Sequence, residues 1–280
     1  MDRDLQLLIS QALKEDGYDK DVTSLATLNN KQECTGNFIA KAQGVISGMY
    51  IVVEVFRQIN PKIIVDVLKE DGEFVNKGDC IACIKGKMID ILRGERVALN
   101  FLQRMSGIAT MTDKYVQEVA GTQCQIEDTR KTTPLLRKFE RLAVMHGGAK
   151  NHRFNLSDQV LIKDNHIAAV GSITNAVEAA RAKWGPEMIV EVEVETKEEY
   201  LEALETSADI IMLDNMSNEL MGELCEIPHE GKKLEASGNM TINRLRSVAM
   251  LGVDYISVGG LTHSAKALDI SLKFLKKSFK

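Results

Sequence analysis

The sequence predicts an α/β protein with two parts, and two observations lead to this prediction. Up to about Gly94 the apolar runs are short and broken by glycine and Asp-Gly pairs, as in strands joined by tight turns. Later in the chain, strand-like runs are each followed by a helix-like stretch or by a loop leading into one. Repeated β-then-α units predict a parallel sheet covered by helices. Closure into a barrel is favoured, and an open doubly wound sheet is the alternative.

Composition narrows the class of protein. The 280 residues are enough for one large α/β domain or two smaller ones. A formal net charge of −5 argues against a general nucleic-acid binder. The start, MDRDLQLLISQALKED, is too charged for a signal peptide, and no apolar run approaches the length of a membrane span. Five cysteines, an odd number, indicate reduced thiols and predict a cytoplasmic location.

The first part contains the run GDCIACIKGKM, which raises two alternatives to an ordinary strand. Cys80 and Cys83 form a CxxC pair, but residues three apart in a strand point to opposite faces, so we expect neither a zinc nor a redox site. The run also looks like the hammerhead fold of biotinyl and lipoyl carrier domains, with Lys87 as the modified residue. The residues before that lysine are Lys85 and Gly86 instead of the typical alanine and methionine. We therefore expect no modification.

A helix is predicted between the two parts, from Gly94 to Val119. Apolar residues recur there at spacings of three, at Leu99, Leu102, Met105 and Ile108. Gly107 falls inside this pattern and predicts a kink or a break.

The second part contains six strand-like runs: TQCQIEDT, DQVLIKDNH, MIVEVEVET, DIIMLDNM, KLEASGNM and DYISVGGL. Each ends in polar or glycine residues, from Asp128 in the first run to Gly260 in the last. Loops and helix N-termini that follow parallel strands expose unpaired N–H groups, so ligands collect there. Recurrence of polar residues at the same place in consecutive units predicts a site at that end of the sheet.

Positive charge gathers at this end although the chain is acidic. Between Asp128 and Lys163 there are eight Lys/Arg residues against three acids. An anionic ligand would explain the excess. Arg137, Lys138 and Arg141 belong instead to a helix-like stretch after Pro134, where we expect a solvated helix face.

Two further patterns point to phosphate and to a metal ion. EASGNMT and SVGGLTHSA place small residues between a strand and a helix, where backbone N–H groups converge on an anion. Glu191, Glu193 and Glu195 alternate and so share one face of a strand. In an enclosed strand that face looks inward, and Asp214 at the end of the next strand could join one of them in holding Mg²⁺.

These motifs resemble those of quinolinate phosphoribosyltransferase, also called carboxylating nicotinate-nucleotide pyrophosphorylase. The resemblance is carried by DTRKTTP, HGGAKNHRFNLSDQVLIKDNH, EVEVET, IMLDNMS, LEASGN and ISVGGLTHSA. It extends to GERVALNFLQRMSGIAT and to EDGYDKDVTS, and so covers nearly the whole chain in order.

The resemblance implies a fold and an activity. The fold would be an N-terminal α/β sandwich domain over residues 1–110 and an incomplete, seven-stranded-type α/β barrel over 111–265, with a helix over 266–280 that packs back on the first domain. The protein would be a homodimer or larger. It would convert quinolinate and phosphoribosyl pyrophosphate, with Mg²⁺, to nicotinate mononucleotide, pyrophosphate and CO₂ in NAD biosynthesis. The alternatives are a sibling phosphoribosyltransferase acting on another pyridine acid and a homologue related to molybdenum uptake.

The resemblance also assigns residues to roles. Substrate binding falls to Thr129, Arg130, Lys131, His152, Arg153, Lys163, Glu193 and Asp214, and to Arg96 reaching in from the partner subunit. Four of these carry the catalytic role: Lys131, Lys163, Glu193 and Asp214. Glu193 and Asp214 would also hold the metal. The 5′-phosphate would be bound by Ser237, Gly238, Asn239, Gly259, Gly260, Leu261 and His263. Many relatives have glycine where this chain has Asn239, which would change a side-chain contact without removing N–H donors.

Overall fold

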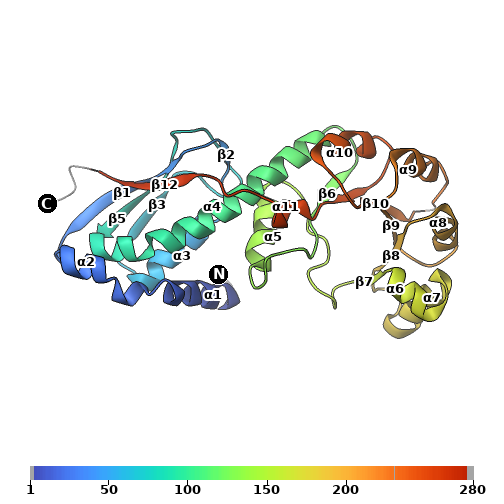
Figure 1. Cartoon of the computed structure of the whole chain (residues 1–280), viewed down its shortest axis with the longest axis horizontal. Coiled ribbons are helices and arrows are strands. Elements are labelled where there is room, and N and C mark those ends of the chain that lie inside the picture. The colour runs from blue at the N-terminus through green and yellow to red at the C-terminus, as the bar shows by residue number, and fades with distance from the viewer. Residues whose placement is uncertain (1–2, 230, 276–280) are drawn as a thin grey trace. The chain divides into compact units, whose positions relative to one another are not determined.

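The computed structural model describes residues 3–229 and 231–275, and the chain divides into two compact units. Among the described residues, the first unit contains 3–113, 133–148 and 264–275, and the second contains 114–132, 149–229 and 231–263 (Figure 1). We expected one division between residues 110 and 111. The units instead group the segment 133–148 with the first part of the chain.

The first unit is built on a four-stranded sheet in the order β12-β1-β5-β3. Its strands, all paired antiparallel, are β1 (Glu33–Ala40), β3 (Ile64–Val67), β5 (Cys80–Lys87) and β12 (Ile270–Phe274). A small ribbon pairs β2 (Gly44–Val45) with β4 (Phe74–Val75). The helices are α1 (Arg3–Glu15), η1 (Tyr18–Lys20), α2 (Val22–Thr27), α3 (Met49–Ile59), α4 (Met88–Glu118, which continues into the second unit) and α5 (Arg137–His146).

A hydrophobic core joins this sheet to α3. Phe38 of β1 and Phe56 of α3 are both fully buried, and their rings meet edge to face with centroids 6.4 Å apart. Burying a side chain of this size contributes about 1.5–3 kcal/mol. The period-2 pattern of β1 and the apolar stripe of α3 therefore meet in one core, as expected for a sheet layered against helices.

The prediction of a helix over residues 266–280 is wrong for the residues that the structure describes. Residues 270–274 form β12, which pairs with β1 so that Ile270 lies opposite Ala40 and Phe274 opposite Gly36. Ile270 and Leu272 are both buried, which is the alternation of a strand with one face on a core. The remainder of the expected helix, residues 276–280, lies outside the described residues.

The helix predicted from the spacing of apolar residues is confirmed as α4, but the break predicted at Gly107 is absent from it. Leu99, Leu102, Met105 and Ile108 are all buried, and the helix runs unbroken from Met88 to Glu118. A Cβ atom at Gly107 would lie 2.1 Å from the backbone oxygen of Lys266. The glycine therefore allows a close approach between two parts of the chain instead of ending the helix.

A β-bulge in β5 reverses the orientation that we expected for the CxxC pair. The register with β1 shifts between Phe38, which pairs with Ala82, and Ile39, which pairs with Cys80. The extra residue leaves Ile81 and Ala82 buried and both cysteines partly exposed, and the Cys80 thiol donates to the carbonyl of Ala82 at 3.6 Å. The expectation of opposite faces was wrong, although both thiols are free.

Two other expectations for the first unit can be compared with the structure. Lys87 ends β5 and α4 begins at Met88, so this lysine does not lie at a turn between two strands as a carrier-domain lysine would.

On α5, Lys138 is paired with Asp4 at 2.7 Å on the surface. Arg141, however, is only 7% exposed, so a solvated face was the wrong expectation for it.

The second unit contains a parallel sheet of six strands in the order β6-β11-β10-β9-β8-β7. These strands are β6 (Gln125–Glu127), β7 (Val160–Ile162), β8 (Val190–Val194), β9 (Ile210–Asp214), β10 (Lys233–Ser237) and β11 (Tyr255–Ser257). They coincide with the six strand-like runs of the sequence. The accompanying helices are α6 (Asp164–Val170), α7 (Ile173–Trp184), α8 (Lys197–Leu204), α9 (Asn218–Cys225), α10 (Ile242–Ala249) and the short α11 (Gly260–His263).

Strand order distinguishes the barrel from the doubly wound alternative. From β7 to β11 each strand lies beside the next one in sequence, and the last strand pairs with the first, β6. A doubly wound sheet reverses direction at a switch point, whereas this order runs around a curve. Helices α7 to α10 lie outside that curve (Figure 1). An isolated parallel bridge between Glu127 and Lys150 extends the sheet by one step beyond β6. The predicted incomplete α/β barrel is confirmed.

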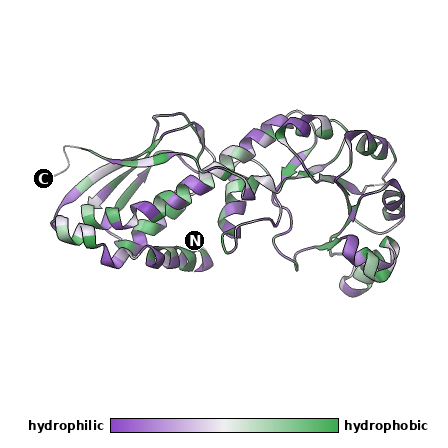
Figure 2. Cartoon of the chain, viewed as in Figure 1, coloured by the Kyte–Doolittle hydropathy of each residue, from purple (hydrophilic) through white to green (hydrophobic). Residues whose placement is uncertain are grey.

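Helices of both units carry hydrophobic and hydrophilic residues side by side (Figure 2). Within residues 3–229 and 231–275, none combines the length and the apolar character needed to cross a lipid bilayer.

Candidate functional site

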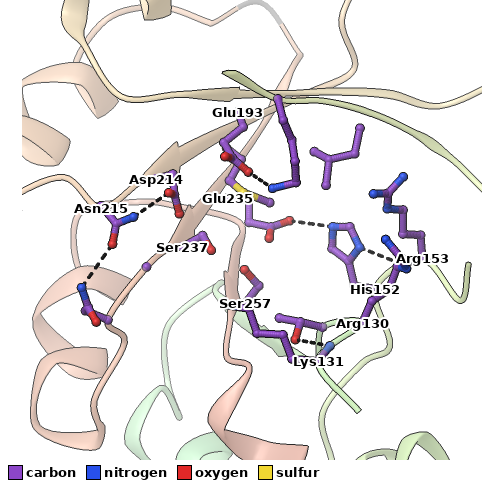
Figure 3. A pocket seen from close by; sticks show the side chains of 16 residues that line it. Arg130, Lys131, His152, Arg153, Glu193, Asp214, Asn215, Glu235, Ser237 and Ser257 are labelled. Atoms are coloured by element: carbon purple, nitrogen blue, oxygen red, sulfur yellow. Dashed lines mark hydrogen bonds and ion pairs between the residues drawn. The ribbon is translucent and has the colours of Figure 1, made fainter. Parts of the chain in front are cut away.

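A cavity of about 490 Å³ lies at the carboxyl ends of the strands in the second unit (Figure 3). Its walls come from several strand ends and from the loop between β6 and β7. The lining residues are Thr129, Arg130, Lys131, His152, Arg153, Leu161, Lys163, Glu193, Met212, Asp214, Asn215, Glu235, Ser237, Gly238, Asn239 and Ser257. The volume is within the usual range of small-molecule sites.

Most residues singled out from the sequence line this one cavity. Those that do not are Arg96, Gly259, Gly260, Leu261 and His263. Arg96 belongs to the first unit, where it is exposed on α4. Gly259 lies beside the cavity, because a Cβ atom there would be 2.9 Å from Cδ of Lys131.

The segment after β6 is held by hydrogen bonds to its backbone. The amide of Lys131 donates to Oγ1 of Thr129 at 3.1 Å, and the hydroxyl of Thr262 donates to the carbonyl of Lys131 at 2.7 Å. Asp128 is fully buried, and its carboxylate accepts the amide of His152 at 2.8 Å. This contact ties the end of β6 to the loop that carries His152 and Arg153, so cations from both segments reach one cavity.

The loop after His152 is anchored to the barrel interior. Nη1 of Arg153 donates to the carbonyl of Gln159 at 3.0 Å, and Nε2 of Gln159 donates to Oε2 of Glu191 at 2.6 Å. Burial, together with the nearby charge of Arg130, lowers the pKa of Arg153. Two guanidinium groups held this close favour an anionic ligand between them. We call Arg130, Lys131, Arg153 and Lys163 the cation rim.

Acidic side chains at the ends of β8 and β9 complete the mouth of the cavity. Glu193 forms an ion pair with Lys163 through Oε2, and Asp214 accepts a hydrogen bond from Nδ2 of Asn215 at 2.6 Å. Glu195, which the alternating pattern placed with Glu191 and Glu193, is exposed beyond the end of β8. Two carboxylates on neighbouring strands are few protein ligands, which is the usual arrangement for Mg²⁺ that is shared with substrate phosphates. The donor set thus fits that ion.

The loop after β10 approaches the loop after β9 closely. Gly238 has φ +81, and a Cβ atom there would lie 2.2 Å from Oδ1 of Asn215, so only glycine fits. Asn215 and Asn239 also have positive φ, at 54 and 52. Asparagine is among the few other residues that tolerate this conformation. Nδ2 of Asn239 donates to Oδ1 of Asn215 at 3.2 Å, which is the side-chain contact that a glycine would lack.

Below the rim lies a buried layer of carboxyl groups, which we call the acid floor: Glu127, Glu191 and Glu235. Their exposures are 9%, 0% and 1%. They come from β6, β8 and β10, each a few residues before a residue of the cavity mouth. Three acids packed inside a barrel require protons or cations to offset their charge.

His152 stands between the rim and the acid floor. Its Nε2 is 2.9 Å from Oε2 of Glu191 and 3.5 Å from Oε2 of Glu235, and the ligand atoms of Glu127, His152 and Glu235 lie within 4.8 Å of one another. Burial lowers the pKa of His152, but the contacts with Glu191 and Glu235 outweigh it and raise that pKa to about 10. Burial and the neighbouring Glu235 raise the pKa of Glu127 to about 7. Burial and Glu191 raise the pKa of Glu235 as well.

Some lining residues were not identified from the sequence: Leu161, Met212, Asn215, Glu235 and Ser257. A usable signal existed for Glu235, which lies two residues before Ser237 and therefore on the same face of β10. Leu161, Met212 and Ser257 are ordinary strand residues whose inward direction depends on closure of the sheet, whereas Asn215 follows the end of β9 directly.

Comparison with known proteins gives consistent matches over the chain. Family models described as the N-terminal and C-terminal domains of quinolinate phosphoribosyl transferase match residues 21–106 and 108–273. A probable nicotinate-nucleotide pyrophosphorylase [carboxylating] of Bacillus subtilis is 42% identical over 96% of this chain and 92% of its own. A chloroplastic relative from Arabidopsis thaliana is also 42% identical, over 96% and 82%. The crystal structure of NadC from Streptococcus pyogenes superposes with a TM-score of 0.92 at 41% identity, covering 96% of both chains.

Proposed function

Because the chain belongs to the quinolinate phosphoribosyl transferase family, we propose that it is the decarboxylating quinolinate phosphoribosyltransferase of de novo NAD biosynthesis. It transfers the phosphoribosyl group of phosphoribosyl pyrophosphate to quinolinate and releases pyrophosphate and CO₂, leaving nicotinate mononucleotide. The observation that carries this proposal is the cation rim, which surrounds one cavity of about 490 Å³ at the mouth of an α/β barrel.

Quinolinate binding falls to the rim. Its two carboxylates require two sets of donors, and Arg130 and Arg153 each offer a planar fork that fits a carboxylate in a bidentate way. Lys163 adds an ammonium group from the end of β7. Each charge-assisted hydrogen bond contributes roughly 1.5–3 kcal/mol net, so the pair of guanidinium groups supplies most of the affinity.

The phosphoribosyl donor occupies the other side of the cavity. The loop of Ser237, Gly238 and Asn239 presents backbone N–H groups to the 5′-phosphate, with Gly259, Gly260, Leu261 and His263 on the neighbouring turn. Lys131, the rim residue beside Gly259, contacts the departing pyrophosphate. Asp214 and Glu193 would hold Mg²⁺, which would supply positive charge to offset that of the leaving group.

The transfer step needs positioning more than covalent chemistry from the protein. The pyridine nitrogen attacks the anomeric carbon of the ribose as the bond to pyrophosphate breaks, and positive charge develops on the sugar. Glu193 and Asp214 stabilise that charge, while Lys131 and Lys163 stabilise the leaving anion. Preorganised groups of this kind contribute about 3–4 kcal/mol each. The quaternary nitrogen that results withdraws electrons from the ring and favours loss of the adjacent 2-carboxylate.

Incubation with quinolinate, phosphoribosyl pyrophosphate and Mg²⁺ tests the proposal. We expect nicotinate mononucleotide, pyrophosphate and CO₂ in equal amounts. A phosphoribosyltransferase for a pyridine monocarboxylate is the second candidate, and nicotinate tested in parallel distinguishes the two. Turnover of nicotinate without turnover of quinolinate would contradict the proposal.

We further propose a homodimer in which Arg96 of each subunit reaches the site of its partner. Arg96 is exposed and does not line the cavity of the second unit, which is consistent with a role outside its own subunit. Mixed dimers of Arg96→Ala and Arg153→Ala subunits should recover part of the activity, because one of the two shared sites would be intact. No recovery in verified mixed dimers would refute the shared site.

The five free cysteines support a cytoplasmic location.

A further inference from the structure

We propose that Glu235 is a neutral carboxylic acid at the base of the cavity and that it donates the proton which replaces the 2-carboxylate during decarboxylation. This inference rests on the proposed function. It extends that function to a residue of the acid floor, since Glu235 alone among the three acids lines the cavity.

The surroundings of Glu235 differ from those of Glu191. Oε2 of Glu191 faces two donors, Nε2 of Gln159 at 2.6 Å and Nε2 of His152 at 2.9 Å. Glu235 is 1% exposed, and the donors beside it are Nε2 of His152, 3.5 Å from Oε2, and the hydroxyl of Ser257. An ionised carboxylate buried in this way would be costly, so the group is stable in its neutral form.

The orientation of His152 supports the same assignment. The amide of Arg153 donates to Nδ1 of His152 at 2.7 Å, so Nδ1 carries no hydrogen and the ring hydrogen is on Nε2, toward the acids. The proton affinity that Glu191 and Glu235 give to His152 is therefore shared with the carboxyl oxygens that face Nε2. Glu235 is one of these two acids, and it is the one that also lines the cavity.

The chemistry requires such a donor. When the bond between C2 and its carboxylate breaks, CO₂ leaves and the electron pair stays on C2, beside the positively charged ring nitrogen. The O–H bond of Glu235 then breaks, its proton forms the new C2–H bond, and Glu235 is left as a carboxylate that takes a proton from water before the next cycle. Because CO₂ recombines with C2 until that proton arrives, the donor makes the step irreversible. The guanidinium groups of the rim hold their protons too tightly to substitute readily, and the ammonium groups of Lys131 and Lys163 serve the leaving anion in the proposed transfer step.

Glu235→Gln keeps the size of the side chain and removes the acidic proton. In a single turnover followed by rapid quenching, pyrophosphate formation should change by less than about threefold. CO₂ release should fall by about 10²-fold or more, the range found for general acids. The dicarboxylate mononucleotide should accumulate between the two steps. Glu235→Asp, which retains an acid, should release CO₂ faster than Glu235→Gln, and Glu195→Gln at the exposed end of β8 serves as the control.

Equal loss of both steps, or no loss in either, would overturn the proposal, because a residue that only shapes the pocket affects the transfer step as well. If Glu235→Gln does not fold, as judged by circular dichroism, the pair Glu235→Asp and Glu235→Asn repeats the comparison in a shorter side chain. A wild-type protein that forms no nicotinate mononucleotide would contradict the proposed function instead, so the two failures are distinguishable.

Discussion

The cation rim and the acid floor belong to the same barrel, yet their side chains lie in different surroundings. Rim residues stand outside the strands, where they line the cavity. Floor residues stand inside the barrel at 9% exposure or less, where burial raises the pKa of Glu127 and Glu235. The depth of an acidic side chain in the barrel therefore determines how strongly burial favours its protonated form.

Removing one rim cation should have the largest effect. Arg153→Ala should lower kcat/KM for quinolinate by roughly 10²-fold, because two charge-assisted hydrogen bonds worth about 3 kcal/mol together are lost. The Michaelis constant for phosphoribosyl pyrophosphate should change far less. Steady-state kinetics with each substrate varied in turn measures both values. Lys138→Ala, which removes a cation on the surface of the first unit, is the matched control. Equal changes for the two substrates would contradict the assignment of Arg153 to the quinolinate pocket.

An acid at the mouth should behave differently from an acid in the floor. Asp214→Asn keeps an oxygen at the end of β9 but removes its charge, so kcat should fall by roughly 10-fold to 10²-fold and the Mg²⁺ concentration needed for half activity should rise. Titration of activity with Mg²⁺ at saturating substrates gives the result. A Mg²⁺ dependence identical to that of the wild type would exclude Asp214 as a metal ligand.

An acid of the floor should instead make the free energy of unfolding depend on pH. The pKa of Glu127 is raised from 4.5 to about 7, so its contribution to folding is fully present below pH 4.5 and is lost as the pH rises through 7. One pKa unit corresponds to about 1.4 kcal/mol, which gives a loss of about 3 kcal/mol by pH 8. Glu127→Gln does not titrate and should escape this loss. It should therefore gain about 3 kcal/mol relative to the wild type between pH 4 and pH 8.

Urea denaturation at both pH values measures that difference in the free energy of unfolding. Glu195→Gln, at an exposed position, should show no comparable change. A difference between Glu127→Gln and wild type that stays constant with pH would mean that folding does not raise the pKa of Glu127.

The same contrast explains which features the sequence revealed. Rim residues such as Arg130 and Lys163 were predicted because they follow strands directly, and the end of a parallel strand is a place that local patterns can locate. Glu235 was missed because its inward direction depends on closure of a sheet whose neighbours lie far along the chain. Period-2 alternation did place Glu191 and Glu193 on the inner face, but it could not say that Glu195 lies beyond the enclosed part of β8.

Errors in the first unit have a related origin. The alternation rule that separates residues three apart failed at Cys80 and Cys83 because one extra residue, Ile81, enters the strand as a bulge, and only the pairing with β1 determines that register. The helix expected at the C-terminus failed because Ile270 and Leu272 pack on a core whose other strand, β1, is more than two hundred residues earlier. In both cases the partner strand, and not the local sequence, decides the outcome.

The smallest effect should come from a residue of the mouth that acts through its backbone. Asn239 has φ 52, and its side chain touches Asn215 at 3.2 Å, whereas its role in phosphate binding needs only an N–H group. In Asn239→Gly the left-handed conformation becomes easier while one exposed hydrogen bond is lost, and these changes nearly cancel. The Michaelis constant for phosphoribosyl pyrophosphate should therefore change by less than about threefold. A tenfold increase in this Michaelis constant, with the transfer rate unchanged, would show that the amide side chain of Asn239 itself binds the phosphate. The phosphate would then have a side-chain ligand at this loop in addition to backbone N–H groups.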